Sequence, residues 1–149
     1  MDIQKQFYDS IQENDIENFK ILLNNKKINP SDANNWAIQV SSMYGNLEII
    51  KLLLKDKRVN PSCNGNFPVE VASNGGYLDI IKLLLNDKRV DPSDSSNRAI
   101  CSAYSKGYLN IVNLLWQDER VQNTLKKDNF NLYNELIKKD KIKNKVEIF

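Results

Sequence analysis

The sequence repeats itself with a period of 31 residues. The string LLLKDKRVNPS at positions 52–62 returns as LLLNDKRVDPS at positions 83–93. A catalytic motif has no need of a second copy at a fixed spacing, whereas a structural unit that stacks on copies of itself does. This repeat constrains the fold more than any other feature of the chain.

Aligning the chain at this period gives ten positions at which three successive units carry the same residue. These columns are Pro30/Pro61/Pro92, Ser31/Ser62/Ser93, Asn35/Asn66/Asn97, Gly45/Gly76/Gly107, Leu47/Leu78/Leu109, Leu52/Leu83/Leu114, Leu53/Leu84/Leu115, Asp56/Asp87/Asp118, Arg58/Arg89/Arg120 and Val59/Val90/Val121. So many identities at one spacing indicate an internal structural repeat.

Each unit is predicted to contain two short helices. The first begins at Asn35, whose side chain can accept a hydrogen bond from an N–H of the first turn. It ends at Gly45, a residue that readily takes the left-handed conformation. The second covers residues 46–56, where apolar side chains recur at helical spacing. Residues 57–66 contain Pro61 and many turn-forming residues, so we expect an extended loop between units.

The segment PVEVASNGGYLDIIKLLL, residues 68–85, resembles the ankyrin repeat. Pro68, Val69, Ala72 and Gly76 stand at the signature positions of that family. The resemblance implies an all-α solenoid of helix-turn-helix repeats, with about four helix pairs and a C-terminal capping helix. The unit is two residues shorter than the usual length of about 33, and the missing residues fall in the loop. This D-x-R-V-D/N-P-S variant is similar to arrays in amoebae and large DNA viruses.

We expect a single ankyrin-repeat domain over residues 1–149. Its predicted parts are an N-terminal capping repeat (1–28), three repeats (29–59, 60–90 and 91–121) and a C-terminal cap (122–149). A terminal repeat must present a polar outer face to water, and the first helix of the opening unit is accordingly polar. Ile142 and Val146 are assigned to a second short helix of the closing cap.

The composition argues against several classes of enzyme. The chain has no histidine, which excludes the Ser-His-Asp triad and the HExxH zinc site, and it has no glycine-rich phosphate-binding motif. Cys63 and Cys101 are interpreted as free thiols of a reducing compartment. We therefore expect no enzymatic activity, no cofactor and no metal, and a cytoplasmic location, in a host cell if the source is viral. No apolar run is long enough to cross a bilayer, and no secretory signal is visible.

Charge is distributed unevenly along the chain. The net charge is +2, with 21 basic and 19 acidic residues. Residues 126–149 hold seven lysines and four acids, or +3, which leaves 14 basic against 15 acidic residues, or −1, for residues 1–125. Most basic segments are solvated helix faces. This charge does not favour nucleic acid as the partner. The resemblance to the ankyrin repeat implies instead that the partner is another protein, bound by a monomer or weak oligomer. The alternative is an oligomer-forming or nucleic-acid-associated scaffold that uses the basic end.

The resemblance also implies that a partner protein is recognised on the concave side of the stack. The candidate contacts are positions that differ between units, in contrast to the ten columns that are identical in all three. They are Asp32, Ala33, Trp36, Met43, Tyr44, Asn64, Phe67, Asn74, Asp94, Arg98, Ser105 and Lys106. Trp36 and Phe67 stand where the family usually has threonine. They are interpreted either as aromatic anchors for the partner or as spacers between shortened loops.

Overall fold

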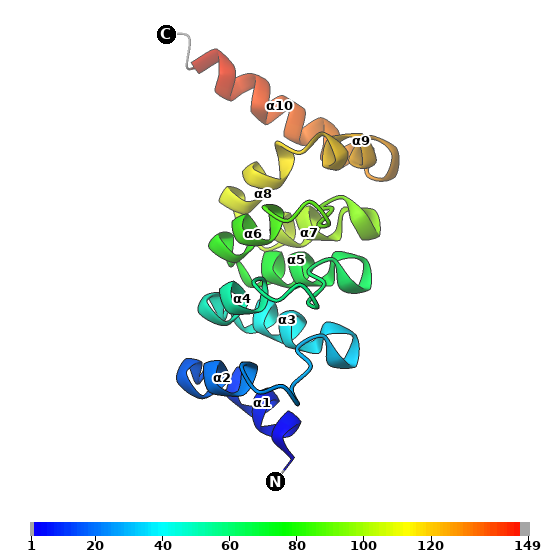
Figure 1. Ribbon diagram of the computed structural model, residues 1–149. Coiled ribbons are helices and arrows are strands. Elements are labelled where there is room, and N and C mark those ends of the chain that lie inside the picture. The colour runs from blue at the N-terminus through cyan, green and yellow to red at the C-terminus, as the bar shows by residue number, and fades with distance from the viewer. Residues whose placement is uncertain (1, 147–149) are drawn as a thin grey trace.

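The chain forms an elongated stack of helix pairs (Figure 1). The computed structural model describes the backbone of residues 2–146 and the side chains of residues 2–139. This part contains ten helices and no strand. They are α1 (Ile3–Gln12), α2 (Ile16–Leu23), α3 (Asp32–Tyr44), α4 (Leu47–Leu53), α5 (Cys63–Gly75), α6 (Leu78–Leu85), α7 (Asp94–Ser105), α8 (Leu109–Trp116), α9 (Glu119–Asp128) and α10 (Phe130–Val146). The predicted all-helical repeat solenoid is confirmed.

The helices are arranged in two layers. The first helices of the pairs, α1, α3, α5, α7 and α9, contact one another in succession, and α2, α4, α6 and α8 do the same in a second layer. Small residues at one position of the first helices, Ser41, Ala72 and Ala103, are fully buried and let the paired helices approach closely. Leu84 of α6 is also fully buried, near the middle of the stack.

Left-handed residues follow the first helix in each of the first four pairs. Gly45 and Gly76 have φ of 78°, and Gly107 has φ of 76°. Asn14 takes the equivalent place in the opening unit with φ of 53°. These helix ends are therefore as predicted, and the turn leads directly into the second helix.

The connecting loops contain a second left-handed element that was not predicted. Three consecutive residues have positive φ in each loop: Ala33, Asn34 and Asn35; Asn64, Gly65 and Asn66; Ser95, Ser96 and Asn97. They lie inside the spans of α3, α5 and α7, so the right-handed part of each helix begins just after them. Asparagine and glycine tolerate this conformation better than most residues. The loop is thus a compact left-handed turn in place of the extended segment that was expected.

The repeated Asn/Asp-Pro-Ser and Asp-x-Arg-Val strings fix these loops. Asp91 Oδ1 accepts hydrogen bonds from the Ser93 N–H at 2.9 Å and from Ser93 Oγ at 2.7 Å. Asp87 accepts from Arg89, whose Nη1 also donates to the carbonyl of Val59 in the preceding loop at 3.2 Å. Arg58 and Arg120 make the same bond one unit earlier and one unit later. The repeated letters therefore encode both the turn and its link to the neighbouring unit.

The column Asn35/Asn66/Asn97 does not cap helices, contrary to the prediction. Asn35 Oδ1 accepts the backbone N–H of Asn60 at 2.7 Å, and Asn66 Oδ1 accepts that of Asp91 at 2.9 Å. The left-handed backbone turns these amides toward the loop of the next unit. Asn35 and Asn66 therefore join successive units.

The C-terminal end of the stack, where a cap was predicted, consists of two helices. It contains a fifth helix pair, α9 and α10, and α9 begins at Glu119, before the predicted boundary at residue 122. Ile142 and Val146 lie within the continuous helix α10 and not in a separate short helix; their side chains fall outside the described residues. The unit boundaries as a whole remain a prediction.

Candidate functional site

The predicted contact residues lie on the loop turns and near the two ends of the first helices α3, α5 and α7. We call this set of twelve residues the variable face. The exposed members are Asp32, Ala33, Met43, Tyr44, Asn64, Asn74, Asp94, Arg98, Ser105 and Lys106, while Trp36 and Phe67 are half-buried. Met43 is 44% exposed and Tyr44 is 53% exposed at the end of α3, high values for such large apolar side chains.

Three loop-turn members of the variable face are bonded to neighbouring units. Tyr8 of α1 donates its hydroxyl to Asp32 Oδ2 at 3.3 Å. The Asn34 amide donates to Asn64 Oδ1, and Asn66 Nδ2 donates to Asp94 Oδ2 at 2.9 Å. These bonds run along the stack, so the polar tips are held in fixed positions before any partner arrives. Such preorganisation lowers the entropic cost of binding.

Trp36 and Phe67 do not act as a matched aromatic pair. The Trp36 ring lies 4.5 Å from the Tyr8 ring, measured between centroids, and packs against the core. Phe67, one unit later, makes no aromatic ring contact within the described part of the chain. The structure therefore brings Trp36 together with Tyr8, which no sequence pattern had singled out, and leaves Phe67 at the surface.

Charged groups at the variable face are partly paired. Arg98 Nε lies 3.4 Å from Glu70 Oε2, a salt-bridge distance without hydrogen-bond geometry. The pKa of Tyr8 is raised, first by burial and then by the charge and hydrogen bond of Asp32. Tyr8 is therefore a neutral hydroxyl donor at physiological pH.

The two thiols have the character of packed side chains. Cys63 is buried, and its burial raises the pKa of the thiol to about 11. Cys101 is half-buried, and burial also raises its pKa. Because the thiolate is the reactive form, both cysteines are poor nucleophiles at neutral pH. Within the described residues, no three His, Cys, Asp or Glu side chains come together as metal ligands.

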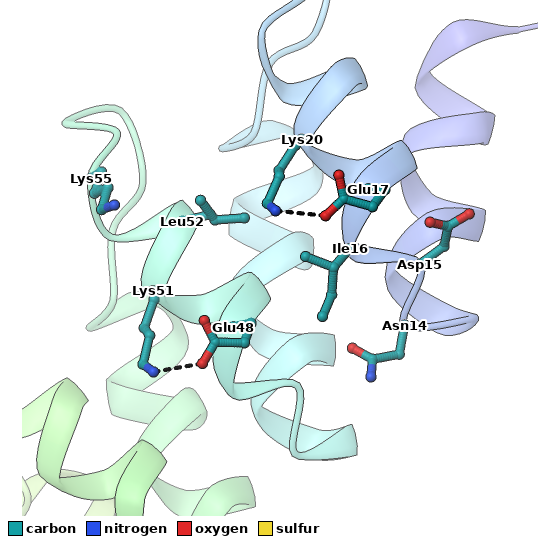
Figure 2. A pocket seen from close by; sticks show the side chains of 9 residues that line it. All are labelled: Asn14, Asp15, Ile16, Glu17, Lys20, Glu48, Lys51, Leu52 and Lys55. Atoms are coloured by element: carbon teal, nitrogen blue, oxygen red, sulfur yellow. Dashed lines mark hydrogen bonds and ion pairs between the residues drawn. The ribbon is translucent and has the colours of Figure 1, made fainter.

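An open groove of about 550 Å³ runs between α2 and α4 on the side of the second helices. Figure 2 shows Ile16 and Leu52 pointing toward the space between these helices. Four charged side chains on its rim form two pairs, Lys20 Nζ with Glu17 Oε1 at 2.7 Å and Lys51 Nζ with Glu48 Oε1 at 2.6 Å. Each pair lies along a single helix and is well exposed, which is the pattern of a solvated helix surface and not of a reactive pocket.

The predicted basic end is only partly described. Lys126 and Lys127 lie in the last turn of α9, and Lys139 of α10 pairs with Glu135 at 3.0 Å. The side chains of Lys141, Lys143 and Lys145 lie outside the described residues. None of the described helices combines the length and apolar character needed to cross a membrane.

Two comparisons bear on the family. The family model described as "Ankyrin repeats (3 copies)" matches residues 7–96, more than half of the chain. Among curated proteins, a search finds no match. The matched region runs from α1 into the first residues of α7 and so includes three of the helix pairs.

Proposed function

The chain belongs to the ankyrin repeat family, and we propose that it is a non-catalytic module that binds a partner protein through the variable face. Ankyrin repeats are generally protein–protein interaction modules. Our proposal goes further and names the surface of the stack that binds the partner and the residues that form it.

One observation carries the proposal: the invariant leucines of the core and the variable positions have different surroundings. Leu53, Leu84 and Leu115 are identical between units and fully buried, so they stabilise the stack and cannot discriminate between partners. Most variable positions are exposed on loop turns and first helices. A ligand that lies across successive units would meet a different chemical group at each step.

The apolar part of the variable face supplies the proposed anchor. Met43 and Tyr44 are exposed at the end of α3, and Phe67 is half-buried at the start of the right-handed part of α5. Large aromatic side chains are frequent hot spots of protein interfaces. The bonded tips Asp32, Asn64 and Asp94 would add polar contacts around this apolar group.

The proposal also covers the extent of the module, its oligomeric state and its location in the cell. Residues 1–149 act as one binding module, as a monomer or weak oligomer. The two free thiols support a reducing compartment, and we place the module in the cytoplasm.

The proposal is tested by affinity capture with the intact chain, followed by measurement of Kd for the captured partner. Tyr44→Ala and Phe67→Ala should each weaken binding by more than about 1 kcal/mol, roughly fivefold in Kd, where they are hot spots. The free energy of unfolding should change little, since both side chains are largely outside the core. Trp36→Ala should lower stability as well, because it also removes the packing on Tyr8.

The matched control is Lys82→Ala, an exposed change on α6 at the opposite side of the helix pairs. It should leave Kd unchanged. Full binding by the triple variant of Trp36, Tyr44 and Phe67 would contradict the proposal and move the site to the segment from Lys126 to Lys145. A steep decrease of log K with log salt for RNA or DNA would instead favour nucleic acid as the partner.

A further inference from the structure

Tyrosine rings cover the glycine turns in the middle of the stack. A Cβ added at Gly45 would lie 2.7 Å from Cε1 of Tyr77, which belongs to the next unit. A Cβ at Gly76 would lie 2.9 Å from Cζ of Tyr108. Each ring lies against the turn of the preceding unit, so closely that only glycine leaves room for it.

This series of covered turns stops at Gly107. A Cβ there would meet no atom within 4 Å. The residue one period beyond Tyr108 is Lys139, whose Nζ lies 5.2 Å from the centre of the Tyr104 ring instead. Leu109 is 58% exposed, whereas Leu47 and Leu78 of the same column are half-buried and packed against the core. Among the described residues, the pair α7 and α8 thus has no aromatic ring on the surface where the two preceding pairs each carry one.

A small hollow lies beside this surface, and we call it the end pocket. Its volume is about 120 Å³, and its walls include Leu109, Val112 and Trp116 of α8 and Leu136 and Lys139 of α10. Figure 1 shows α10, in orange to red, running away from the stack at this end. An apolar cavity of about 150 Å³ can hold benzene. The end pocket is smaller and open to solvent, and its walls also carry the polar side chains of Asn113, Gln117 and Lys139. It therefore suits a partly inserted ring with a polar substituent, such as that of tyrosine.

We propose that the end pocket is a docking site for an aromatic side chain at the first turn of a partner protein's amphipathic helix. The partner's ring would lie by Gly107 and Leu109 as Tyr77 lies by Gly45, and the helix would continue the layer of α4, α6 and α8. The contact with the partner would resemble the interface between successive units of the chain. It lies on the second-helix side and does not depend on the variable face.

A second copy of the chain does not fit this site through its opening unit. Asn14 and Asp15 stand there in the columns where Gly76 and Tyr77 stand. Asp15 accepts the N–H of Asn18 and caps α2. Stacking two copies end to end would bring a carboxylate, and no ring, to the end pocket, at a cost in desolvation.

The first test uses p-cresol, the side chain of tyrosine, with the full wild-type chain. The chain has two tryptophans, and Trp116 lines the end pocket while Trp36 lies at the other side against Tyr8. In a ¹⁵N-NMR titration, the indole N–H signal of Trp116 should shift saturably and that of Trp36 should not. Equal shifts of both signals, or none, would overturn the proposal. This test needs no variant, so folding cannot confuse it.

The second test uses a fluorescein-labelled peptide with the sequence of residues 76–86, GYLDIIKLLLN, extended by two lysines for solubility. Replacing its tyrosine with alanine should weaken binding to the full chain at least fivefold. Leu109→Ala in the chain should weaken binding at least threefold, and Ile21→Ala, an aliphatic residue 71% exposed on α2, should not. Equal binding of both peptides would overturn the proposal. So would concentration-dependent dimerisation that Leu109→Ala abolishes, since the occupant would then be a second copy.

Discussion

The middle loops and the C-terminal end use the same asparagine with different results. Asn66 and Asn97 have nearly the same left-handed backbone, with φ of 59° and 61°. The Asn66 side chain accepts the N–H of Asp91 and donates to Asp94. The Asn97 amide is fully buried, and neither of its polar atoms has a hydrogen-bond partner in the described residues. A repeated residue keeps its conformation, but what it contributes depends on the neighbour.

The neighbour differs because α9 takes the place of a fourth loop. Asp118, Arg120 and Val121 keep the repeated letters, and Arg120 still donates to the Val90 carbonyl at 3.3 Å. Beyond them the Asn/Asp-Pro-Ser string is absent, and α9 continues as a helix with Val121 and Leu125 buried. The cap thus keeps the arginine link to the preceding loop and adds amphipathic packing, whereas the middle units also have the asparagine link between loops.

The largest expected effect is that of a core change at the centre of the stack. Leu84→Ala removes a fully buried side chain from α6 and should lower the free energy of unfolding by about 2–5 kcal/mol. Ile3→Ala, in the half-buried start of α1, should lower it less. Urea denaturation of both variants measures the difference. The reverse order would show that the opening unit is not a cap.

The second prediction compares the two asparagines directly. Glycine tolerates positive φ, so Asn66→Gly and Asn97→Gly both keep the left-handed turn and remove a similar volume. Asn66→Gly also deprives the Asp91 N–H of its acceptor. It should therefore cost about 1–3 kcal/mol more than Asn97→Gly, which removes a buried amide without partners. Equal losses of stability in urea denaturation would mean that the hydrogen bonds of Asn66 contribute nothing.

The helix pairs could be predicted from the sequence because their signals are local. Apolar spacing gives the second helices, and the glycine column gives the ends of the first. The loop turn could not be predicted, because nothing local to Asn35 shows that its amide accepts an N–H from Asn60, 25 residues later. The start of α9 could not be predicted either. The string from Asp118 to Val121 keeps the Asp-x-Arg-Val pattern that ends the two preceding units, and nothing in it shows that a helix begins here.

The variable face was predictable as a set of positions, but not in its internal contacts. Differences between units identify the aligned positions at which the repeat does not require one particular residue. They do not reveal that Asp32 is bonded to Tyr8 or that Trp36 packs on the same tyrosine, because Tyr8 belongs to the least regular unit. The end pocket could have been suspected from Lys139 at the tyrosine position, although its size depends on the direction of α10.

The smallest predicted effect concerns the aspartates that accept hydrogen bonds from the repeated arginines. Such Asp–Arg pairs occur both in the middle loops and at the C-terminal end. Hydrogen bonds from Arg58, Arg89 and Arg120 lower the pKa values of Asp56, Asp87 and Asp118. A lowered pKa in the folded state means that these carboxylates stabilise the fold above the unfolded-state value of about 3.9. This contribution is lost as the pH falls through the lowered folded-state values.

Asp87→Asn should accordingly reduce the free energy of unfolding by roughly 0.5–1 kcal/mol at pH 7, a small amount because Arg89 is about half exposed. The difference between wild type and variant should shrink as the pH falls below about 4, because Asp87 of the unfolded chain is protonated there while the folded carboxylate still resists protonation. Urea denaturation at pH 7, 5, 4 and 3 measures it, with the exposed Asp128→Asn in α9 as the matched control. A difference that stays constant down to pH 3 would mean that the charge of Asp87 is irrelevant. The contribution of Arg89 to the loop link would then come from its bond to the Val59 carbonyl alone.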